Sequence, residues 1–496
     1  MNTNQTIKPT LEQEEIFEAF QTHRVLKVNA VAGSGKSSTL RMLAERNNKP
    51  SLYVSFNKAI AEEASQKFPS HVECKTTHKI AYERYGRALA HKMKRPEKGQ
   101  PYRNVAGTPS EIALFYKVQP FYCNESEITP NCIASLVRQV VRKYQNSSEE
   151  QITKILLPFG EIKALEKNHP GMDVKAFSDI VVKLAKRLWL DRVDPMSGVL
   201  IEHDTYLKLW QLSKPVLDYE ILYVDEAQDS NPAVLDVIQR QTHCKIVYVG
   251  DTYQSIYAFR QAVNAMEMIQ APTKILSKSF RYGQAIADVA SMIIDYAIEV
   301  KGNEVIKSKV EDVTQKQYTK IYRTNSLLLK EAVELLSKGN KVYCDVDTYD
   351  FTNKLKSAEA LYLGNTKFVK HQDITPYPEW KDLVLAADED LELKRVMKIV
   401  EKGKVFFYVK ALEKLADKNS KYDIFLTTAH KSKGKEWDNV IIANDFPVDK
   451  IFTLERKKDC LWTQQEINLM YVACTRAIKT LQLHKDMCVV DEDFEV

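Results

Sequence analysis

Two glycines, a lysine and two serines lie close together in NAVAGSGKSSTL, residues 29–40. An apolar stretch at residues 25–28 predicts a strand before them, and residues 37–46 predict a helix after them. Glycines between a strand and a helix let backbone amides and the positive helix end surround a phosphate. Lys36 is then placed to reach the β- and γ-phosphates, and Ser37 to bind Mg²⁺. The segment predicts a nucleotide site, because Lys-Ser directly after the last glycine is unusual in a plain glycine turn.

The spacing matches the pattern G-x-x-x-x-G-K-[ST], with Ala30 in place of the first glycine. The nucleotide-binding positions predicted in this loop are Ala30, Gly33, Ser34, Gly35, Lys36, Ser37 and Ser38.

Adjacent carboxylates end a second apolar stretch, ILYVDEAQDS at residues 221–230. Asp225 is placed at the carboxyl end of the strand to hold Mg²⁺, and Glu226 beside it to orient or deprotonate water. This pair predicts hydrolysis rather than transfer of a phosphoryl group to a substrate. A third strand, KIVYVGD, leads into a loop in which Gln254 is placed to contact the γ-phosphate, and the same loop carries Tyr257 and Phe259.

Length and composition bound the class of protein. The 496 residues suit roughly two to four domains, and 44% hydrophobic residues suffice for their cores. The net charge of +5, from 71 basic and 66 acidic residues, argues only weakly for a polyanionic partner. The eight cysteines contain no C-x-x-C pair, which argues against a zinc or iron–sulfur site and for free thiols. With no apolar signal core and no membrane-length run, we expect a cytoplasmic protein, in the host cytoplasm if it is phage-encoded.

Six segments resemble, in order and approximate spacing, motifs I to VI of the superfamily 1A DNA helicases related to UvrD, Rep and PcrA. They are AVAGSGKS, VDEAQD, VGDTYQSIYAFR, KSFRYG, TTAHKSKGKEWDNV and NLMYVACTRA. The resemblance covers the chain from Gln13 to about Leu481. The segment HDTYLKLWQLSKP, at residues 203–215, is most similar to the F-box-helicase-like branch and its small bacterial or phage relatives, although the sequence shows no F-box.

The resemblance implies further contacts with ATP. Gln13 matches the residue at the adenine edge and Phe280 the aromatic residue that stacks on the base, although both also suit ordinary helix or core positions. Arg281 and Arg476 match two arginines that reach the γ-phosphate from the second core domain. A guanidinium suits this role because it is permanently charged and forks onto phosphate oxygens. Glu436 matches a glutamate near the ribose and triphosphate.

The resemblance also implies contacts with single-stranded DNA, which is held by backbone charge and base stacking. Tyr257 and Phe259 match aromatic residues on which bases stack. His78 also suits a capped or core histidine. The positions that match contacts to the DNA backbone are Phe56, Asn57, Thr76, Thr77, His78, Thr428 and His430.

These motifs imply an α/β fold of two RecA-like P-loop domains, with parallel sheets flanked by helices and with helical insertions. A stripe at Phe177, Ile180, Leu184 and Leu188 has helical spacing and is expected to face a core. Basic residues and tyrosines between 84 and 103 suit either a duplex contact or a solvated face. The expected domains are a first core at 1–79 and 201–271, a mainly helical insertion at 80–200, a second core at 272–364 and 422–496, and a reduced helical insertion at 365–421.

The resemblance implies a monomeric, ATP- and Mg²⁺-dependent translocase on single-stranded DNA that unwinds duplexes from 3′ to 5′. It implies a place in replication, recombination or repair, binding to single/double-strand junctions, and contacts with other replication or recombination proteins. Two alternatives use the same motifs. One is a translocase that strips recombinase or other proteins from single strands with little unwinding. The other is a non-motor ATP-gated DNA clamp, which Glu226 and the two arginines disfavour.

Overall fold

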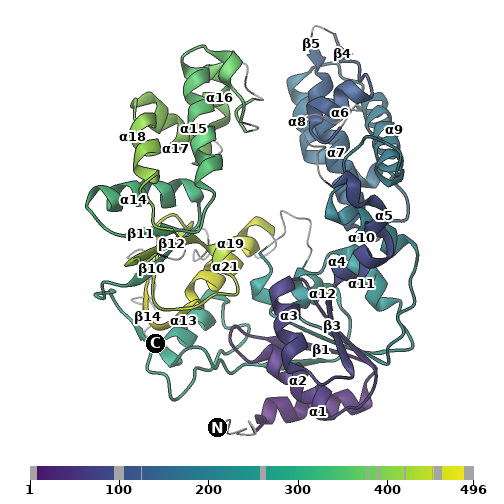
Figure 1. Cartoon of the computed structure of the whole chain (residues 1–496), viewed down its shortest axis with the longest axis vertical. Coiled ribbons are helices and arrows are strands. Elements are labelled where there is room, and N and C mark those ends of the chain that lie inside the picture. Colours follow the sequence, from purple (N-terminus) through teal and green to yellow (C-terminus); the bar gives the residue numbers. More distant parts are fainter. Residues whose placement is uncertain are drawn as a thin grey trace. The chain divides into compact units, whose positions relative to one another are not determined.

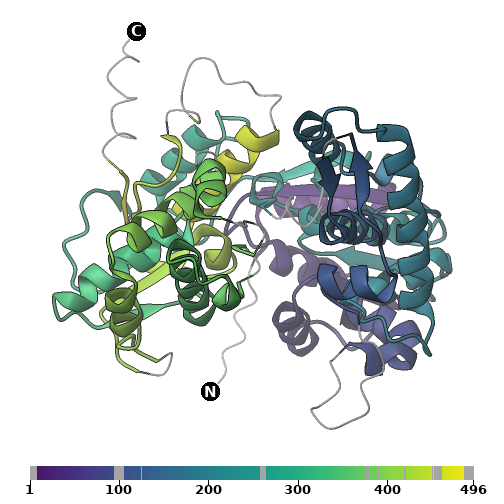
Figure 2. The same cartoon turned by 90° about the horizontal axis from the view of Figure 1, so that it is seen from above.

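The computed structural model describes residues 8–93, 106–124, 126–256, 264–371, 373–375, 377, 379–387, 391–417, 420–448, 451 and 461–484. By their contacts, Met1–Ala30 and Lys36–Leu276 form one compact unit, and Val31–Gly35 and Ser277–Val496 form a second. Each unit contains a parallel sheet flanked by helices, which confirms the expected α/β fold with two RecA-like sheets (Figures 1 and 2). No helix in the described part of the chain has both the length and the apolar composition needed to cross a membrane.

The sheet of the first unit has six strands in the order β3-β2-β6-β7-β1-β8, and all neighbouring pairs are parallel. The central strands β6 and β7 are buried along almost their whole length, as expected for strands covered on both faces. The strands are β1 (Val25–Ala30), β2 (Ser51–Ser55), β3 (Val72–Thr76), β6 (Ile221–Val224), β7 (Lys245–Gly250) and β8 (Thr273–Leu276).

Helices cover both faces of this sheet (Figure 1). Alternate residues of β2 face opposite ways, since Leu52 and Val54 belong to one apolar cluster and Tyr53 to the other. The cluster around Tyr53 contains residues of α1 (Leu11–Thr22), α2 (Lys36–Glu45) and α3 (Lys58–Lys67). The opposite cluster contains residues of α4 (Thr77–Ala81), α10 (His203–Leu212), α11 (Pro232–Gln239) and α12 (Ala265–Met268).

Strand β8 corrects the expected boundary between the two cores. The second core is predicted to start at residue 272, but Lys27 to Ala30 of β1 pair with Thr273 to Leu276. The short run of alternating burial in β8 fits the open edge of β1, so the first sheet continues to Leu276.

The described part of residues 80–200 is mainly helical and has its own apolar core. Phe177 and Leu188 are fully buried in this core and Leu184 packs against it, as the helical stripe predicted. Ile180 was expected there too, but its side chain is 39% exposed, so the stripe is narrower than predicted. The elements are the π-helical turn Tyr82–Gly86, α5 (Arg87–Leu89), α6 (Pro109–Phe115), the antiparallel pair β4 (Phe121–Cys123) and β5 (Ser126–Ile128), α7 (Pro130–Asn146), α8 (Phe159–Asn168) and α9 (Val174–Val193).

The sheet of the second unit has the order β11-β12-β10-β13-β14-β9, again with parallel neighbours. Its strands are β9 (Lys309–Val310), β10 (Tyr318–Tyr322), β11 (Val342–Cys344), β12 (Ile424–Thr428), β13 (Trp437–Ile442) and β14 (Ala477–Gln482). The helices of this unit are α13 (Gln284–Ile293), α14 (Asn325–Ser337), α15 (Thr348–Tyr362), α16 (Trp380–Ala387), α17 (Leu391–Glu401), α18 (Val405–Leu412), α19 (Ala429–Ser432) and α21 (Leu461–Cys474).

Residues 365–421 contain α16, α17 and α18, in line with the helical periodicity of the sequence. Their buried side chains do not form a separate core. Val396 of α17 and Val405 of α18 belong to the same apolar cluster as Leu328 of α14 and Leu426 of β12. This segment is therefore packed as part of the second unit.

Candidate nucleotide and DNA sites

The loop after β1 has the backbone that the glycine pattern predicts. Gly33 and Gly35 have φ angles of 78° and 77°, in the left-handed region that favours glycine. A Cβ at Gly33 would lie 2.6 Å from Oγ of Ser279 and 2.7 Å from Cβ of Arg281, so a larger residue does not fit. The amide of Phe280 donates to the Gly33 carbonyl at 2.8 Å. These contacts explain why residues 31–35 group with the second unit.

Ser34 has a buried hydroxyl group that a ligand could satisfy. Its side chain is 1% exposed, and its Oγ has no hydrogen-bond partner within the described residues. A buried hydroxyl without a partner costs about 1–3 kcal/mol, so this atom is better satisfied by an added oxygen. Ser38 lies exposed in the first turn of α2. The loop therefore fits the phosphate group that the sequence predicts.

Lys36 begins α2, one residue before the predicted helix start. Its Nζ lies 3.3 Å from Oε1 of Glu226. Burial opposes a charge on Lys36, but the carboxylates of Glu226, Asp251 and Asp225 outweigh it and raise the pKa of Lys36 above its ordinary value. The lysine therefore stays positive, as contact with a triphosphate requires.

Asp225 follows β6 and is held by three donors. Oδ2 accepts hydrogen bonds from Ser37 Oγ at 2.7 Å and from the Tyr53 hydroxyl at 2.5 Å, and Oδ1 accepts one from the Glu226 amide at 2.9 Å. Burial and the adjacent Glu226 carboxylate raise the pKa of Asp225. Carboxylate and hydroxyl oxygens are the ligands that Mg²⁺ prefers, so Ser37 and Asp225 fit the predicted metal. Tyr53 was not predicted, because nothing in its local sequence indicates the contact.

Glu226 has a backbone conformation that is unusual for a residue other than glycine, with φ 52° and ψ 42°. Such residues cost on the order of 1–3 kcal/mol and occur where the surrounding structure requires them. Its Oε2 accepts a hydrogen bond from Nε2 of Gln228, and Oε1 of Gln228 accepts one from the Asp251 amide. Gln228 thus connects the end of β6 to the end of β7.

Asp251 directly follows β7 and was not predicted as a site residue, although an acid after an apolar strand was a usable signal. Its Oδ2 accepts a hydrogen bond of 2.7 Å from Nε2 of Gln254. Burial raises the pKa of Asp251. Gln254 was predicted to contact the γ-phosphate, and here its amide nitrogen faces Asp251. Asn29, at the end of β1, accepts hydrogen bonds from the amide and hydroxyl of Thr252.

Gln13 and Ala30 both have structural roles near the loop. Oε1 of Gln13 accepts from the Thr10 amide at 2.9 Å as part of a capping box at the start of α1, and its Nε2 donates to Thr39 at 2.8 Å. Ala30 is the buried last residue of β1. The predicted adenine contact of Gln13 stays a prediction.

Four predicted ATP contacts, Phe280, Arg281, Glu436 and Arg476, lie in the segment of the second unit that begins at Ser277. The side chain of Phe280 is 44% exposed, and its stacking on the base stays a prediction. Arg281 Nε donates to Oε2 of Glu436 at 2.6 Å, and its Nη1 donates to the Thr475 carbonyl at 3.2 Å. The two predicted residues Arg281 and Glu436 are thus ion-paired with each other.

Arg476 lies directly after α21 and is 1% exposed. Its guanidinium donates to the carbonyls of Val472 and Lys435 and to Oγ1 of Thr475. These bonds hold the side chain against its own unit. The role of Arg476 at the γ-phosphate stays a prediction.

Residues 10–273 match the family model described as the UvrD/REP helicase N-terminal domain, which covers more than half of the chain. The chain belongs to the UvrD/REP helicase family. It is 30% identical over 519 residues to F-box DNA helicase 1 of Gallus gallus, across 97% of this chain and 49% of that protein. It is 30% identical over 519 residues to F-box DNA helicase protein 1 of Schizosaccharomyces pombe, across 96% and 57%. The expected resemblance is confirmed, and the chain spans about half the length of these relatives.

The predicted DNA contacts of this UvrD/REP helicase are only partly described, because Tyr257 and Phe259 lie outside the described residues. His78 Nε2 lies 3.3 Å from Oδ1 of Asp204 in α10. Burial tends to raise the pKa of Asp204, but the hydrogen bond and charge of His78 outweigh it and lower that pKa. Asp204 orients the ring of His78 and was missed, although it lies in the segment that resembles the F-box-helicase-like branch.

The remaining predicted DNA positions combine capping and burial. Asn57 and Thr76 accept hydrogen bonds from backbone amides at the starts of α3 and α4. Thr77 is buried, and its Oγ1 has no partner within the described residues. The others are Phe56, partly buried against the core of the first unit, Thr428, buried at the start of α19, and His430, partly exposed in α19.

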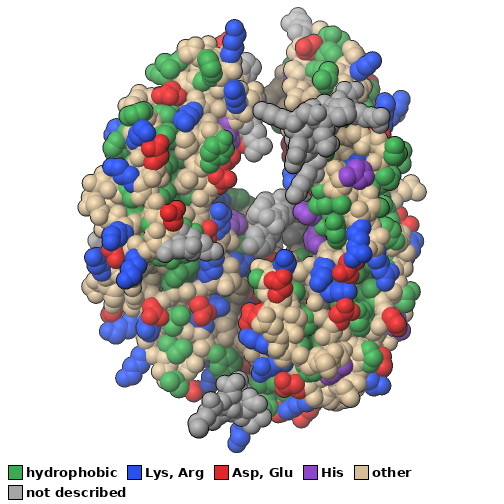
Figure 3. Space-filling model, viewed as in Figure 1, with side chains coloured by type: hydrophobic (Ala, Val, Ile, Leu, Met, Phe, Trp, Pro, Cys, Tyr) green, Lys and Arg blue, Asp and Glu red, His purple; other side chains and the backbone are tan. Residues whose placement is uncertain are grey.

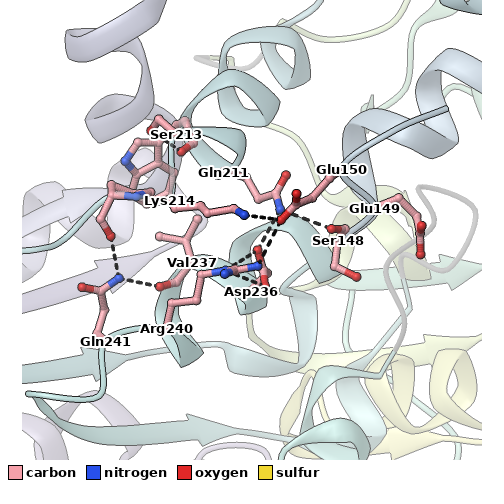
Figure 4. A network of polar contacts seen from close by, with 12 residues as sticks. Ser148, Glu149, Glu150, Gln211, Ser213, Lys214, Asp236, Val237, Arg240 and Gln241 are labelled. Carbon is pink, nitrogen blue, oxygen red and sulfur yellow. Dashed lines mark hydrogen bonds and ion pairs between the residues drawn. The ribbon is translucent and has the colours of Figure 1, made fainter.

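A polar network joins the segment after α7 to α10 and α11, the helix that follows the Asp225–Glu226 pair (Figure 4). Asp236 accepts hydrogen bonds from Gln211 at 2.7 Å and from Arg240 at 3.0 Å. Glu150 pairs with Lys214 at 2.6 Å and with Arg240 at 3.7 Å. We refer to these five residues as the α7–α11 network. It fixes α11, and with it the acidic end of β6, to the helical part of the first unit.

Proposed function

We propose that this chain is a single-stranded DNA translocase and DNA helicase driven by ATP hydrolysis. The observation that carries the proposal is the constellation in the first unit, in which Lys36, Ser37, Asp225 and Glu226 lie within hydrogen-bond or ion-pair reach of one another. Membership of the UvrD/REP helicase family and 30% identity to two proteins named F-box DNA helicases support the DNA part.

Each residue of the proposed nucleotide site has a proposed role. Lys36 binds the β- and γ-phosphates together with the glycine loop, and Ser34 Oγ donates to a phosphate oxygen. Glu226 orients or deprotonates the attacking water, and Gln254 senses the γ-phosphate. Arg281 and Arg476 stabilise the charge that develops on the transferred phosphoryl group. Ser37 and Asp225 hold Mg²⁺, which supplies charge neutralisation for the phosphates when bound.

The finer parts of the proposal rest on the family resemblance. We propose 3′ to 5′ movement, binding to single strands and to single/double-strand junctions, and action as a monomer. Tyr257 and Phe259 are proposed to stack on bases, and His78 to contact the DNA backbone. Replication, recombination or repair is the proposed setting, with contacts to other proteins of those processes.

Steady-state ATP hydrolysis with and without a single-stranded oligonucleotide tests the function most directly. We expect turnover to require Mg²⁺ and to rise in the presence of the oligonucleotide. Equal turnover with and without DNA would contradict a motor whose ATP hydrolysis is stimulated by DNA. Partial duplexes with either a 3′ or a 5′ single-stranded tail then test unwinding and its direction, since a clear preference for the 5′ tail would reverse the proposed polarity and leave the ATPase roles intact.

A further inference from the structure

Tyr53 lies at the middle of β2 with its side chain fully buried. The strand pairs in parallel with β3 and β6, and Tyr53 lies opposite Cys74 and Tyr223 in the two registers. Its ring packs against Phe68 with the ring centroids 4.8 Å apart. Packing on all sides restricts the ring to one position in the core, so its hydroxyl has a fixed direction.

This hydroxyl donates the shortest of the three hydrogen bonds to Asp225, at 2.5 Å to Oδ2. Ser37 donates to the same oxygen from the exposed start of α2. Because Ser37 is itself a proposed metal ligand, its hydrogen bond to Asp225 is the one that metal binding replaces. Tyr53 is confined to the core and keeps its hydrogen bond.

We propose that Tyr53 is a positioning residue for the divalent metal, because its hydroxyl holds the Asp225 carboxylate in the orientation in which the remaining lone pairs bind Mg²⁺. Mg²⁺ demands nearly ideal octahedral geometry, so a carboxylate that can rotate is a poorer ligand. Hydrogen bonds from an outer residue to a ligand typically change metal affinity by about 10–100-fold. The proposal rests on the proposed ATPase function and adds a residue outside the glycine loop and the acidic strand end.

The test compares Tyr53→Phe with Tyr248→Phe as a matched control. Tyr248 lies in β7 of the same sheet and is also buried, but its hydroxyl has no hydrogen-bond partner within the described residues. Both variants remove one oxygen from a buried ring and conserve its volume, so both should fold. Thermal unfolding without nucleotide verifies this.

Binding of a fluorescent ATP analogue is titrated with Mg²⁺ and also measured in EDTA. We expect Tyr53→Phe to raise the Mg²⁺ concentration at half-maximal binding by about 10–100-fold, with binding in EDTA unchanged. Tyr248→Phe should bind as the wild type does. Turnover of Tyr53→Phe should recover when Mg²⁺ is raised to saturation, as expected for a positioning role.

An unchanged Mg²⁺ midpoint in Tyr53→Phe would overturn the proposal, and so would an equal shift in both variants, since that would indicate a general loosening of the sheet. A wild-type chain that binds the analogue with Mg²⁺ but does not hydrolyse ATP would contradict the proposed function instead. The Mg²⁺ midpoints would still decide the role of Tyr53 in that case.

Discussion

At the scale of single residues, Glu226 combines two features that suit chemistry better than stability. Its backbone is in the left-handed region, and its partly exposed carboxylate lies close enough to the buried carboxylates of Asp225 and Asp251 to raise their pKa values. Lys36 offsets part of the resulting repulsion through its ion pair with Glu226. A residue kept in so costly an arrangement is the strongest candidate for contact with the reacting water.

Glu226→Gln tests this assignment. We expect DNA-stimulated turnover to fall by about 10²–10⁴-fold, the usual contribution of a general base, while ATP binding is retained. Glutamine keeps the shape of the side chain and an oxygen that accepts the hydrogen bond from Gln228. The loss of turnover should therefore come from removal of the basic carboxylate and not from a change in the local structure. Turnover is measured with a coupled assay, and nucleotide affinity by equilibrium binding.

Glu220→Gln is the matched control, because Glu220 lies directly before β6 and its exposed side chain pairs with Lys49 at the surface. It should leave turnover close to that of the wild type. Near-normal turnover in Glu226→Gln would instead indicate that another carboxylate is the general base, with Asp251 as the next candidate.

The sequence predicted the parts of the site that are local in the chain. A glycine loop after a strand and adjacent acids at a strand end are recognisable within a dozen residues, and both are where they were expected. Tyr53 and Asp225 are 172 residues apart, and His78 and Asp204 are 126 apart. Such pairs meet only through sheet order and helix packing, so neither residue carries a local signal of its partner.

At the scale of elements, buried lysines stabilise the carboxyl ends of two helices. Lys208 of α10 donates to the carbonyls of Ser147 and Glu149, just after α7, and lies 4.3 Å from the centre of the Tyr144 ring. Lys92 donates to the carbonyls of Asp191, Arg192 and Asp194 at the end of α9. A cation suits the end of α9 because the last carbonyls of a helix lack intrahelical partners and carry partial negative charge. The carbonyls that Lys208 contacts follow the end of α7.

These lysines predict a dependence of stability on pH. Burial lowers the pKa of Lys208 to about 8, from 10.5. Between these values the unfolded chain holds a proton that the folded chain has lost, so the free energy of unfolding rises with pH in this window. In Lys208→Met the rise should be smaller by on the order of 1–3 kcal/mol, measured by urea unfolding at about pH 7.5 and about pH 9.5.

Lys214→Met provides the comparison, because Lys214 belongs to the α7–α11 network but is half exposed in its pair with Glu150. Its substitution should shift the free energy of unfolding by a similar amount at both pH values. If Lys208→Met showed the same rise with pH as the wild type, the lysine would have to be charged throughout the window.

Two predictions at the level of elements differ from the structure, one about β8 and one about Ile180. The predicted boundary between residues 271 and 272 falls just before β8, which adds Thr273–Leu276 to the edge of β1. The four residues of this edge strand, TKIL, are too few to show a clear alternation of polar and apolar residues. Their sequence therefore cannot be told from that of a linker. Ile180 was misplaced for a related reason, since helical spacing predicts which residues share a stripe but not how wide the buried stripe is.

At the scale of the whole molecule, the 71 basic and 66 acidic residues nearly balance. Figure 3 shows Lys and Arg side chains interspersed with Asp and Glu over the face that it draws. With a net charge of +5, long-range attraction contributes little to DNA binding. Affinity for a single strand must come from local phosphate contacts and from stacking.

Binding of a labelled oligonucleotide should therefore weaken with salt by a bounded amount. Neutralising a few phosphates predicts a loss of roughly 10–100-fold between about 50 mM and about 200 mM NaCl, measured by fluorescence anisotropy. Glu226→Gln should give the same slope, because the residue is assigned to hydrolysis and not to DNA. Affinity that did not change with salt would contradict the phosphate contacts and would leave base stacking as the main contribution to the affinity.

The shared core of the second unit bears on how this chain can be shortened or recombined. Val396 and Val405 lie in the same buried cluster as Leu328 and Leu426. Deleting residues 365–421 would uncover the apolar face of α14 and of the sheet, so the truncated chain should aggregate rather than fold as a smaller motor. An insertion that merely projects from its host can be exchanged between proteins as a cassette. This segment can be replaced only together with the residues beneath it.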